Sequence, residues 1–296
     1  MPVRFVFQTT PGSLNISSDF EMSMKQFCYK NISVKMISTG GVESCYILPD
    51  YHIAFDMGRG PLELIDIPVV FLSHGHLDHA AGLAYYFSQR SLKNLGSGTI
   101  YAPPGVVRPF KKICKQWQKI EKFGYKIDIR PMKAGQRVEI AQNLFVEAHP
   151  ACHRVDALGY TLIRKVKKLK QEYQTLPGEE IKKLKEQNAP IFEIREEPLF
   201  SYSGDTSIEF LLENELPRQA RVLFMEATYI DEARTIERAR LWGHTHLDEI
   251  LEHRHLLENE KIVLVHLSRR YTRQKIKDVL KEKIPPEERG RFEVVL

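Results

Sequence analysis

The 296-residue chain has few cysteines and no long apolar run. Its four cysteines are widely spaced and form no Cys-x-x-Cys pair: they are Cys28, Cys45, Cys114 and Cys152. Neither a disulfide framework nor a cysteine-rich zinc site is therefore expected, and reduced thiols favour a cytoplasmic protein, with an organelle left open. No run approaches the ~20 apolar residues that cross a bilayer, so a membrane protein is not expected. Residues 1–22 lack a compact apolar stretch and carry Asp19 and Glu21, which argues against a signal or transit peptide.

The net charge of the chain is also small. The chain carries 43 Lys and Arg against 38 Asp and Glu, a net charge of +5, which is compatible with a polyanionic partner without demanding one. Hydrophobic residues make up 43% and charged residues 27%, the values of a globular protein with a substantial core. We expect a single domain over 1–296, in which residues 1–32 form an N-terminal extension of unassigned role.

Short apolar, β-branched runs alternate with helical patterns along the chain. The pattern predicts strands at 67–72, 99–102, 144–148, 159–163, 199–203, 222–225 and 262–265. It predicts helices at 80–88, 109–123 and 245–258. Strands that alternate with helices over this length indicate an α/β protein with large sheets.

Residues 164–197 differ from their surroundings. The segment is dense in Lys with few apolar anchors, and Pro177-Gly178 interrupts it. This composition predicts an insertion that projects from the domain as two short helical arms around a turn. Charge runs usually lie on a solvated face. The alternative is an arm that contacts RNA through its lysines, among them Lys165, Lys167, Lys168 and Lys170.

The strongest chemical signal is the sequence SHGHLDH at 73–79, directly after a predicted buried strand. Three imidazoles and a carboxylate this close together are costly to bury unless something binds them. In an extended loop His74 and His76 point the same way, because alternate side chains share a face. Asp78 and His79, where the chain turns into a helix, can address a neighbouring point. The spacing suits two adjacent metal ions, and N and O ligands without cysteine favour zinc, with manganese or iron as alternatives.

Further ligand-type side chains follow other predicted strands: they are His149, His153, Asp205 and His266. Singly, each has an ordinary explanation, because a Gly-Asp turn is common and a histidine after a strand can donate to a backbone carbonyl. Together they recur at the carboxyl ends of strands, where open α/β sheets place their ligands.

These motifs and their order resemble the metallo-β-lactamase superfamily, whose fold is a four-layer αβ/βα sandwich with a dinuclear metal site at one edge of the sheets. Within it, three segments resemble ribonuclease Z, the endonuclease that removes tRNA 3′ trailers. They are HR at 153–154 with GY at 159–160, FMEAT at 224–228 with GHT at 243–245, and LVHLS at 264–268 ending in RY at 270–271. The resemblance covers about residues 36–272.

The resemblance implies a set of metal ligands. One zinc would be held by His74, His76 and His153 and the other by Asp78, His79 and His266, with Asp205 bridging the two. His153 is preferred to His149 because it stands before the Gly-Tyr pair, and His149 stays in view. Asp56 in IAFDMG resembles an aspartate of the family that supports the histidine loop, with an ordinary Asp turn as the alternative.

The reaction follows from such a metal pair. Two cations ~3.5–4 Å apart share a water, lower its pKa and polarise the phosphate, so that a bridging hydroxide attacks phosphorus in line. Asp78 is expected to bind metal and to accept the proton. His244 matches the family's histidine proposed to protonate the leaving 3′ oxygen, with Glu226 orienting its ring. The alternative for His244 and His246 is a polar helix start.

The resemblance further implies that RNA, specifically precursor tRNA, is the substrate, and that the enzyme is a homodimer in which one subunit's arm serves the other's site. Arg270 joins the arm lysines as a candidate for binding RNA. One alternative is a hydrolase of this fold acting on a small phosphodiester, a thioester or a lactam. The remote alternative is a non-catalytic RNA-binding scaffold, which the full set of seven ligand-type side chains makes unfavourable.

Overall fold

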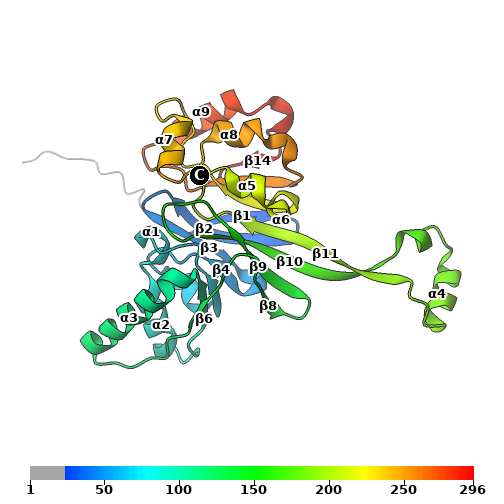
Figure 1. Ribbon diagram of the computed structural model, residues 1–296, viewed down its shortest axis with the longest axis horizontal. Helices are drawn as coiled ribbons and strands as arrows, with labels where there is room; N and C mark the ends of the chain where they lie inside the picture. Colours follow the sequence, from blue (N-terminus) through cyan, green and yellow to red (C-terminus); the bar gives the residue numbers. More distant parts are fainter. Residues whose placement is uncertain (1–23) are drawn as a thin grey trace, which may run out of the picture.

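Two seven-stranded sheets form the centre of the molecule, in a computed structural model that describes residues 24–296 (Figure 1). The first sheet holds its strands in chain order: β1 (Lys25–Tyr29), β2 (Ile32–Thr39), β3 (Glu43–Leu48), β4 (Ile53–Phe55), β5 (Val69–Phe71), β6 (Thr99–Ala102) and β7 (Ile129–Pro131). The strands from β1 to β4 pair antiparallel, and those from β4 to β7 pair parallel.

The second sheet repeats this plan in reverse. Its strands lie in the order β14 (Phe292–Glu293), β13 (Lys261–Val265), β12 (Val222–Glu226), β11 (Phe192–Tyr202), β10 (Leu158–Leu169), β9 (Leu144–Pro150) and β8 (Arg137–Ala141). The strands from β14 to β11 pair parallel and those from β11 to β8 antiparallel. Each sheet therefore has a parallel half, whose strands all end at one edge.

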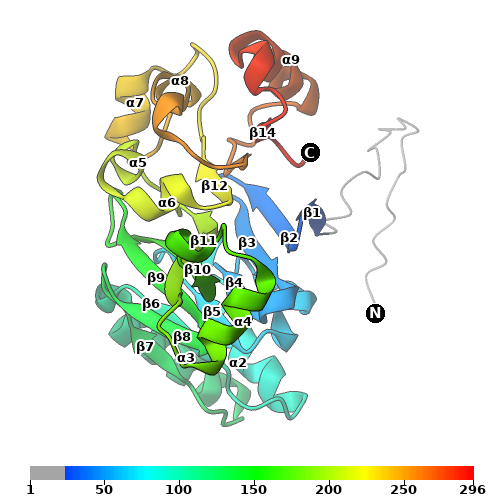
Figure 2. The same ribbon diagram turned by 90° about the vertical axis from the view of Figure 1, so that its right-hand side faces the viewer.

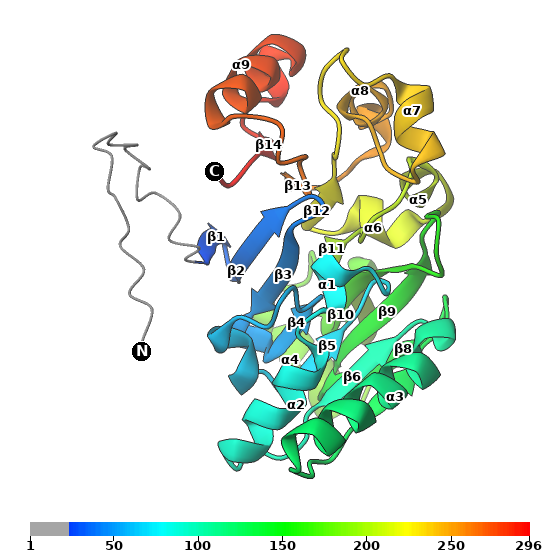
Figure 3. The ribbon, with the colours of Figure 1, turned by 90° about the vertical axis from the view of Figure 1, so that its left-hand side faces the viewer.

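Helices cover the outer face of each sheet (Figures 2 and 3). The first sheet is covered by α2 (Leu83–Leu92) and α3 (Pro104–Glu121), preceded by the single turn α1 (Leu77–Ala80). The second is covered by α5 (Glu209–Glu213), α6 (Glu215–Gln219), α7 (Ile236–Leu241), α8 (Leu247–Glu252) and α9 (Arg273–Lys283). Short 3-10 turns lie at Pro49–Tyr51, Leu62–Asp66, Gln171–Tyr173, Arg254–Leu256 and Pro286–Glu288. The predicted four-layer αβ/βα sandwich of the α/β class is confirmed.

The core between the sheets is aromatic. Phe55 of β4 stacks on Phe200 of β11 with ring centroids 5.5 Å apart, and Tyr46 packs against Tyr202 at 4.7 Å. All four are buried, and full burial of such a side chain contributes roughly 1.5–3 kcal/mol. Hydroxyl groups on this layer reach the strand ends, since Tyr160 donates to the carbonyl of Leu72 at 2.6 Å. The packed aromatic layer thus fixes the two strand edges that carry the site.

Residues 164–197 are a β-ribbon rather than two helical arms. β10 and β11 continue as an antiparallel pair from Arg164–Glu197 to Leu169–Phe192 and project from the body of the molecule, with α4 (Gly178–Glu186) at the tip (Figure 1). The expectation of helices on both sides of the turn was wrong. Backbone pairing between the two strands does not depend on an apolar face, so the low apolar content hid the strands.

Three helix boundaries also differ from those the sequence predicts. The helix predicted at 109–123 begins at Pro104, and Pro109 lies inside it. The helix predicted at 80–88 is split around Gly82, where a side chain would meet the backbone of Gly60 at 2.4 Å. The helix predicted at 245–258 ends at Glu252 and continues only as a 3-10 turn. Local helix propensity is a weak guide to such boundaries, which tertiary contacts determine.

Residues 25–29, placed by sequence in the N-terminal extension, form edge strand β1, while residues 1–23 lie outside the described part of the chain. Among the helices described, none is both long enough and apolar enough to cross a bilayer.

Candidate metal centre

The histidine loop at 73–79 connects β5 to α1, at the carboxyl end of a buried parallel strand. His74 and His79 are fully buried, His76 is exposed, and Asp78 is about 14% exposed. His76 is the residue before the first turn of α1, so the chain changes from extended to helical between His76 and Asp78. This change of direction separates the side chains into two groups, as the sequence predicts.

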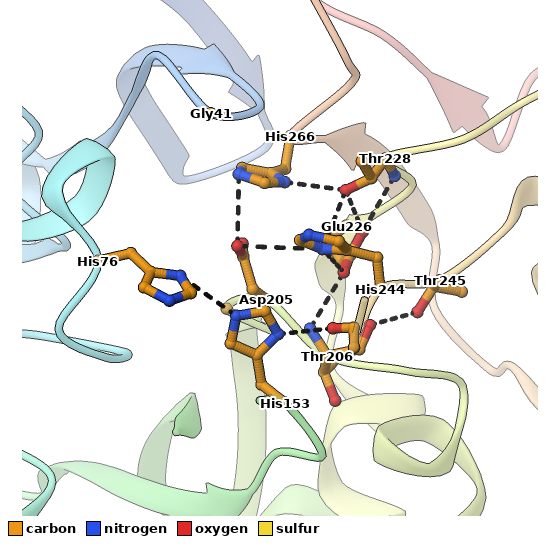
Figure 4. A network of polar contacts seen from close by, with 12 residues as sticks. Gly41, His76, His153, Asp205, Thr206, Glu226, Thr228, His244, Thr245 and His266 are labelled. Atoms are coloured by element: carbon orange, nitrogen blue, oxygen red, sulfur yellow. Dashed lines mark hydrogen bonds and ion pairs between the residues drawn. The ribbon is translucent and has the colours of Figure 1, made fainter. Parts of the chain in front are cut away.

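The strand ends of the second sheet bring three more side chains to the loop (Figure 4). Nε2 of His153, after β9, lies 3.3 Å from Nδ1 of His76. Nε2 of His266, after β13, lies 3.4 Å from Nε2 of His79 and from Oδ2 of Asp78. Two sets of ligand-type atoms result, each within 4.8 Å: His74, His76, His153 and Asp205 in one, and Asp78, His79 and His266 in the other.

Asp205, after β11, joins the two sets. Its Oδ2 lies 3.4 Å from Nε2 of His266 and 3.8 Å from Nε2 of His74, and its Oδ1 lies 3.4 Å from Nε2 of His79. One carboxylate therefore contacts members of both sets. This is the position that a bridging ligand would take.

The other ring nitrogen of four histidines is held by the protein. Nδ1 of His79 lies 2.6 Å from Asp56, Nδ1 of His153 lies 2.6 Å from the carbonyl of Gly243, and Nδ1 of His266 lies 2.9 Å from Oγ1 of Thr228. Nδ1 of His74 lies 2.9 Å from Oγ of Ser73. A carbonyl and a carboxylate only accept, so the Nδ1 atoms of His79 and His153 carry the proton and their Nε2 lone pairs face the cluster. Histidine ligands of metals are typically oriented in this way.

Among residues 24–296, two buried polar atoms at the centre have no hydrogen-bond partner. They are Nε2 of His74 and Oδ1 of Asp205, both facing the cluster. Buried polar atoms are nearly always satisfied, so an imidazole nitrogen and a carboxylate oxygen without partners at one point fit the coordination of a cation. The donor set of five imidazoles and two carboxylates fits zinc and also suits manganese or iron.

The pKa values of the clustered residues shift in different directions. Burial holds the pKa of His74 well below its usual value, with a further contribution from His79. Burial alone would lower the pKa of His79, but the carboxylates of Asp205 and Asp56 raise it well above its usual value. Burial would raise the pKa of Asp205, but His266 and His79 hold it well below its usual value. The centre thus keeps Asp205 ionised and His74 neutral, as metal ligands must be, whereas His79 would release a proton when a cation binds.

Asp56 supports the histidine loop, as expected, and is not one of the clustered ligands. It is fully buried and accepts hydrogen bonds from the backbone N–H of Ser73 at 2.7 Å, from Oγ of Ser73 at 2.8 Å and from the hydroxyl of Tyr202 at 2.7 Å. With Nδ1 of His79, this makes four donors on one carboxylate. Its φ of 55° lies in the left-handed region, which Asp tolerates better than most residues.

The turn between β2 and β3 crosses the centre on the His266 side. The backbone N–H of Gly41 donates to Oδ2 of Asp78 at 3.0 Å, and that of Gly40 donates to the carbonyl of Leu267 at 3.0 Å. A side chain at Gly40 would meet the backbone oxygen of His266 at 2.6 Å, so only glycine fits. The N–H of His266 itself donates to Oγ of Ser38 at 2.8 Å.

His244 lies at the rim of the cluster and is bound to Glu226. Nδ1 of His244 lies 2.9 Å from Oε1 of Glu226 and 4.0 Å from Oδ2 of Asp205. Burial would lower the pKa of His244, but the carboxylates of Glu226 and Asp205 raise it to about 9. His244 also belongs to a third set of ligand-type side chains, with Asp205 and His266. Its Nδ1 is already engaged by Glu226.

Several residues raised by the sequence lie away from the centre. His149 is buried against β10, with Nε2 2.8 Å from Oγ1 of Thr161, and belongs to none of the clusters. His246 caps α8, as its alternative reading held: its Nδ1 accepts from the N–H of Asp248 at 3.1 Å. Arg270 is exposed in the turn after β13. The arm lysines Lys165, Lys167, Lys168 and Lys170 lie on or next to the β-ribbon.

Sequence reasoning assigned no role to several residues that orient the cluster. They are Ser38, Gly40, Gly41, Ser73, Tyr202 and Thr228. Thr228 lies within the FMEAT segment and Ser73 within the histidine motif, so their positions beside the named residues were an available signal. Gly40-Gly41 looked like an ordinary turn, and the contact of Tyr202 with Asp56 spans 146 positions, so no local pattern reveals either role.

Comparisons with known proteins agree with the geometry of the site. Residues 57–267 match the model of the beta-lactamase superfamily domain. The chain is 34% identical over 255 residues to tRNase Z TRZ1 of Arabidopsis thaliana, covering 86% of this chain and 91% of the relative. It is 30% identical over 253 residues to the chloroplastic tRNase Z TRZ2 of the same plant, covering 85% of this chain and 72% of that protein.

A solved structure shows the same fold. The short form of human tRNase Z superposes with a TM-score of 0.56 at 18% sequence identity, over 80% of this chain and 93% of that chain. At this identity the match supports the arrangement of the two sheets and the helices that cover them.

Proposed function

The chain belongs to the beta-lactamase superfamily and, within it, to the tRNase Z family, and on this premise we propose that it is an endoribonuclease that hydrolyses precursor tRNA at its 3′ trailer with a dinuclear metal centre. Membership identifies the chain as a metal-dependent hydrolase, as predicted. The observation that carries the proposal is Asp205, whose carboxylate contacts both sets of ligand-type side chains.

Two cations would be held by His74, His76 and His153 and by Asp78, His79 and His266, with Asp205 between them. When bound, they would lower the pKa of a water molecule and neutralise charge on the phosphate. The chain's own contribution starts with Asp78, the more exposed of the two clustered carboxylates, at 14% against 3% for Asp205. It stands where it can accept the proton released by the attacking water.

His244 supplies the second proton transfer. Its Nδ1 donates to Glu226, and within residues 24–296 its Nε2 has no hydrogen-bond partner, so that Nε2–H is available to the leaving 3′ oxygen. Glu226 orients the ring and is itself held by three donors, the N–H groups of Thr206 and Thr228 and the hydroxyl of Thr228. A general acid held in this way typically contributes 10²–10⁴-fold to the rate.

A cleavage assay on a trailer-bearing precursor tRNA tests the proposal, with bis-p-nitrophenyl phosphate as a second substrate and Asp78→Ala as the inactive control. We expect wild-type cleavage at the trailer junction and near-complete loss in the variant. Hydrolysis of the small diester without cleavage of the RNA would overturn the tRNA assignment and retain the hydrolase. Equal RNA cleavage by wild type and variant would overturn the role of Asp78.

A second part of the proposal concerns how the ribbon arm contacts the substrate. We propose that it contacts tRNA and that the chain works as a homodimer, with the arm of one copy serving the centre of the other, since the arm projects outward (Figure 1). Mixing an Asp78→Ala subunit with one that lacks residues 166–194 tests both points. Restored cleavage, up to about a quarter of the wild-type rate, supports service in trans; no restoration contradicts it.

A further inference from the structure

Helix α3 carries a basic stripe along one side. At 3.6 residues per turn its members fall within roughly 100° of arc. The basic stripe consists of Arg108, Lys111, Lys112, Lys115, Lys119 and Lys122, of which Lys122 is the C-terminal cap of the helix. All except Lys111 are exposed, and within residues 24–296 none of the six pairs with a carboxylate.

The basic stripe does not contribute to the packing of α3. The helix packs through Phe110 and Cys114, on another side. Its one acidic residue, Glu121, also lies away from the stripe, with Oε2 3.5 Å from Oγ of Ser88 on α2. Like charges at positions i and i+4 destabilise a helix, and the stripe contains Arg108 with Lys112 and Lys115 with Lys119. An arrangement that opposes helix formation is explained by a polyanionic partner.

The arm contains more lysines than α3 but carries a smaller net positive charge. Residues 164–197 contain nine basic and seven acidic side chains, whereas residues 104–122 contain six basic and one acidic. The arm also pairs its charges internally. Lys168 is bound to Glu197, and Nζ of Lys165 lies 3.7 Å from Glu196. The net positive charge of α3 is thus larger than that of the arm, and no ion pair among the described residues neutralises it.

The basic stripe begins beside the candidate metal centre. Gly75 of the histidine loop packs on the first turns of α3, where an added side chain would lie 2.9 Å from Val106 and 3.6 Å from Phe110. The backbone N–H of Gly105 donates to Asp156, three residues after His153, at 3.2 Å. An open groove of about 490 Å³ then runs along the helix, lined by Arg108, Lys111, Lys112 and Lys115 on one side and by Pro131 on the other.

We propose that the basic stripe of α3 binds the sugar–phosphate backbone of the RNA substrate where it leaves the metal centre on the side of His76 and His153. This inference rests on the proposed function and adds a second RNA-binding surface, separate from the arm. The stripe is ~21 Å long at 1.5 Å per residue, enough to meet several consecutive phosphates. Its contacts are to phosphates, so it contributes affinity and position rather than base sequence.

The test compares two triple variants that remove the same charge. Lys111→Gln, Lys112→Gln and Lys115→Gln together neutralise the groove. Lys35→Gln, Lys277→Gln and Lys281→Gln together neutralise exposed lysines on β2 and α9. Each protein is assayed for the KM and kcat of precursor-tRNA cleavage at several salt concentrations, for hydrolysis of bis-p-nitrophenyl phosphate, and for its Tm.

For the groove variant we expect the KM for RNA to rise about tenfold, with kcat changed less than twofold. Each lost phosphate contact should reduce the slope of log affinity against log salt by about 0.7–0.9, so three contacts reduce it by about 2–3. Hydrolysis of the small diester should stay within twofold, and the Tm should hold or rise because like-charge repulsion is relieved. The control triple variant should match the wild type.

Three results separate the possible failures. Wild-type cleavage of RNA with an unchanged KM and salt slope in the groove variant would overturn the inference while leaving the proposed function intact. An equal rise of KM in the control variant would overturn it too, because only net charge would then matter. A wild type that hydrolyses the small diester but no RNA would overturn the proposed function itself.

Discussion

Oε1 of Glu226 lies 2.9 Å from Nδ1 of His244, and both side chains end beside the cluster of ligand-type residues (Figure 4). Glu226 is the last residue of β12 and is fully buried, whereas His244 lies on the loop before α8. A rigid strand end therefore orients a side chain that a loop carries. The pair should matter most in the step where the leaving oxygen needs a proton.

Loss of His244 should depend on the leaving group. We expect His244→Asn to reduce kcat for precursor tRNA by ~10²–10³-fold, the usual contribution of a general acid, and to reduce hydrolysis of bis-p-nitrophenyl phosphate by less than fivefold. p-Nitrophenolate leaves without a proton, so an acid is of little use to it. Glu226→Gln should show the same selectivity with a smaller loss. A similar loss on both substrates would instead indicate damage to the metal centre.

Chelation should destabilise the protein through this same centre. With metal ~1,000-fold above its Kd, binding stabilises the fold by about 4 kcal/mol, which corresponds to roughly 5–10 °C in Tm for a chain of this size. Differential scanning calorimetry with and without a chelator measures the shift. Asp205→Asn serves as the control, because it replaces the carboxylate that contacts members of both sets by a neutral amide and should abolish most of the shift. Elemental analysis giving less than one metal ion per wild-type chain would contradict the dinuclear centre.

Asp56 should affect metal binding without touching the metal. Asp56→Asn keeps a residue that tolerates the left-handed φ of 55° but replaces an acceptor oxygen by an NH₂ group among four donors. We expect the free energy of unfolding to fall by about 1–3 kcal/mol and metal affinity to fall about 10–100-fold. Competition with a metal-sensitive dye measures the affinity. Unchanged affinity alongside reduced stability would limit Asp56 to a structural role.

The sequence revealed the candidate ligands because they lie within a few residues of the ends of short apolar strands, in a pattern that needs only local information. It did not reveal the partners of the second nitrogens of His153 and His266 or the contact of Gly41 with Asp78, because these contacts join segments that are distant in sequence. The ribbon arm was missed for a different reason. Its strands are stabilised mainly by pairing with each other, from Arg164–Glu197 to Leu169–Phe192, so they lack the apolar alternation that marks a strand packed on a core.

Two adjacent glycines should respond in opposite ways to a side chain. Gly40→Ala would place a Cβ 2.6 Å from the backbone oxygen of His266, so the β2–β3 turn or His266 must move. We expect a large loss of metal affinity and activity. Gly41→Asn is the matched control, because in the described part of the chain no atom beyond its two neighbours in sequence lies within 4 Å of its added Cβ, and Asn tolerates a φ of 69°. It should retain most activity. Equal effects of the two substitutions, measured by metal titration and RNA cleavage, would contradict the steric explanation.

His149 should make stability depend on pH independently of the metal centre. Burial, together with a smaller effect of the positive charge of Arg137, lowers its pKa from 6.5 to about 4. Glu147, whose Oε1 lies 3.8 Å from Nδ1 of His149, would act the other way, but its carboxylate is already paired with Arg137 at 2.5 Å. The hydrogen bond of His149 is to Oγ1 of Thr161, a neutral hydroxyl, and its ring neighbour Phe210 is uncharged. The folded state therefore requires the neutral imidazole.

The sign of the effect follows from where each state takes up the proton. Between pH 6.5 and 4, His149 is protonated in the unfolded chain and neutral in the folded chain. Its contribution to the free energy of unfolding is therefore fully present above pH 6.5 and is lost as the pH falls toward 4. From pH 7 to pH 5 the loss is about 2 kcal/mol at 1.36 kcal/mol per pKa unit. His149→Gln removes the titration and should leave a shallower dependence in urea melts over this range. Both proteins are measured with a chelator present, so that they differ only at His149. If the free energy of unfolding depends on pH in the same way in both, His149 is not held neutral by burial.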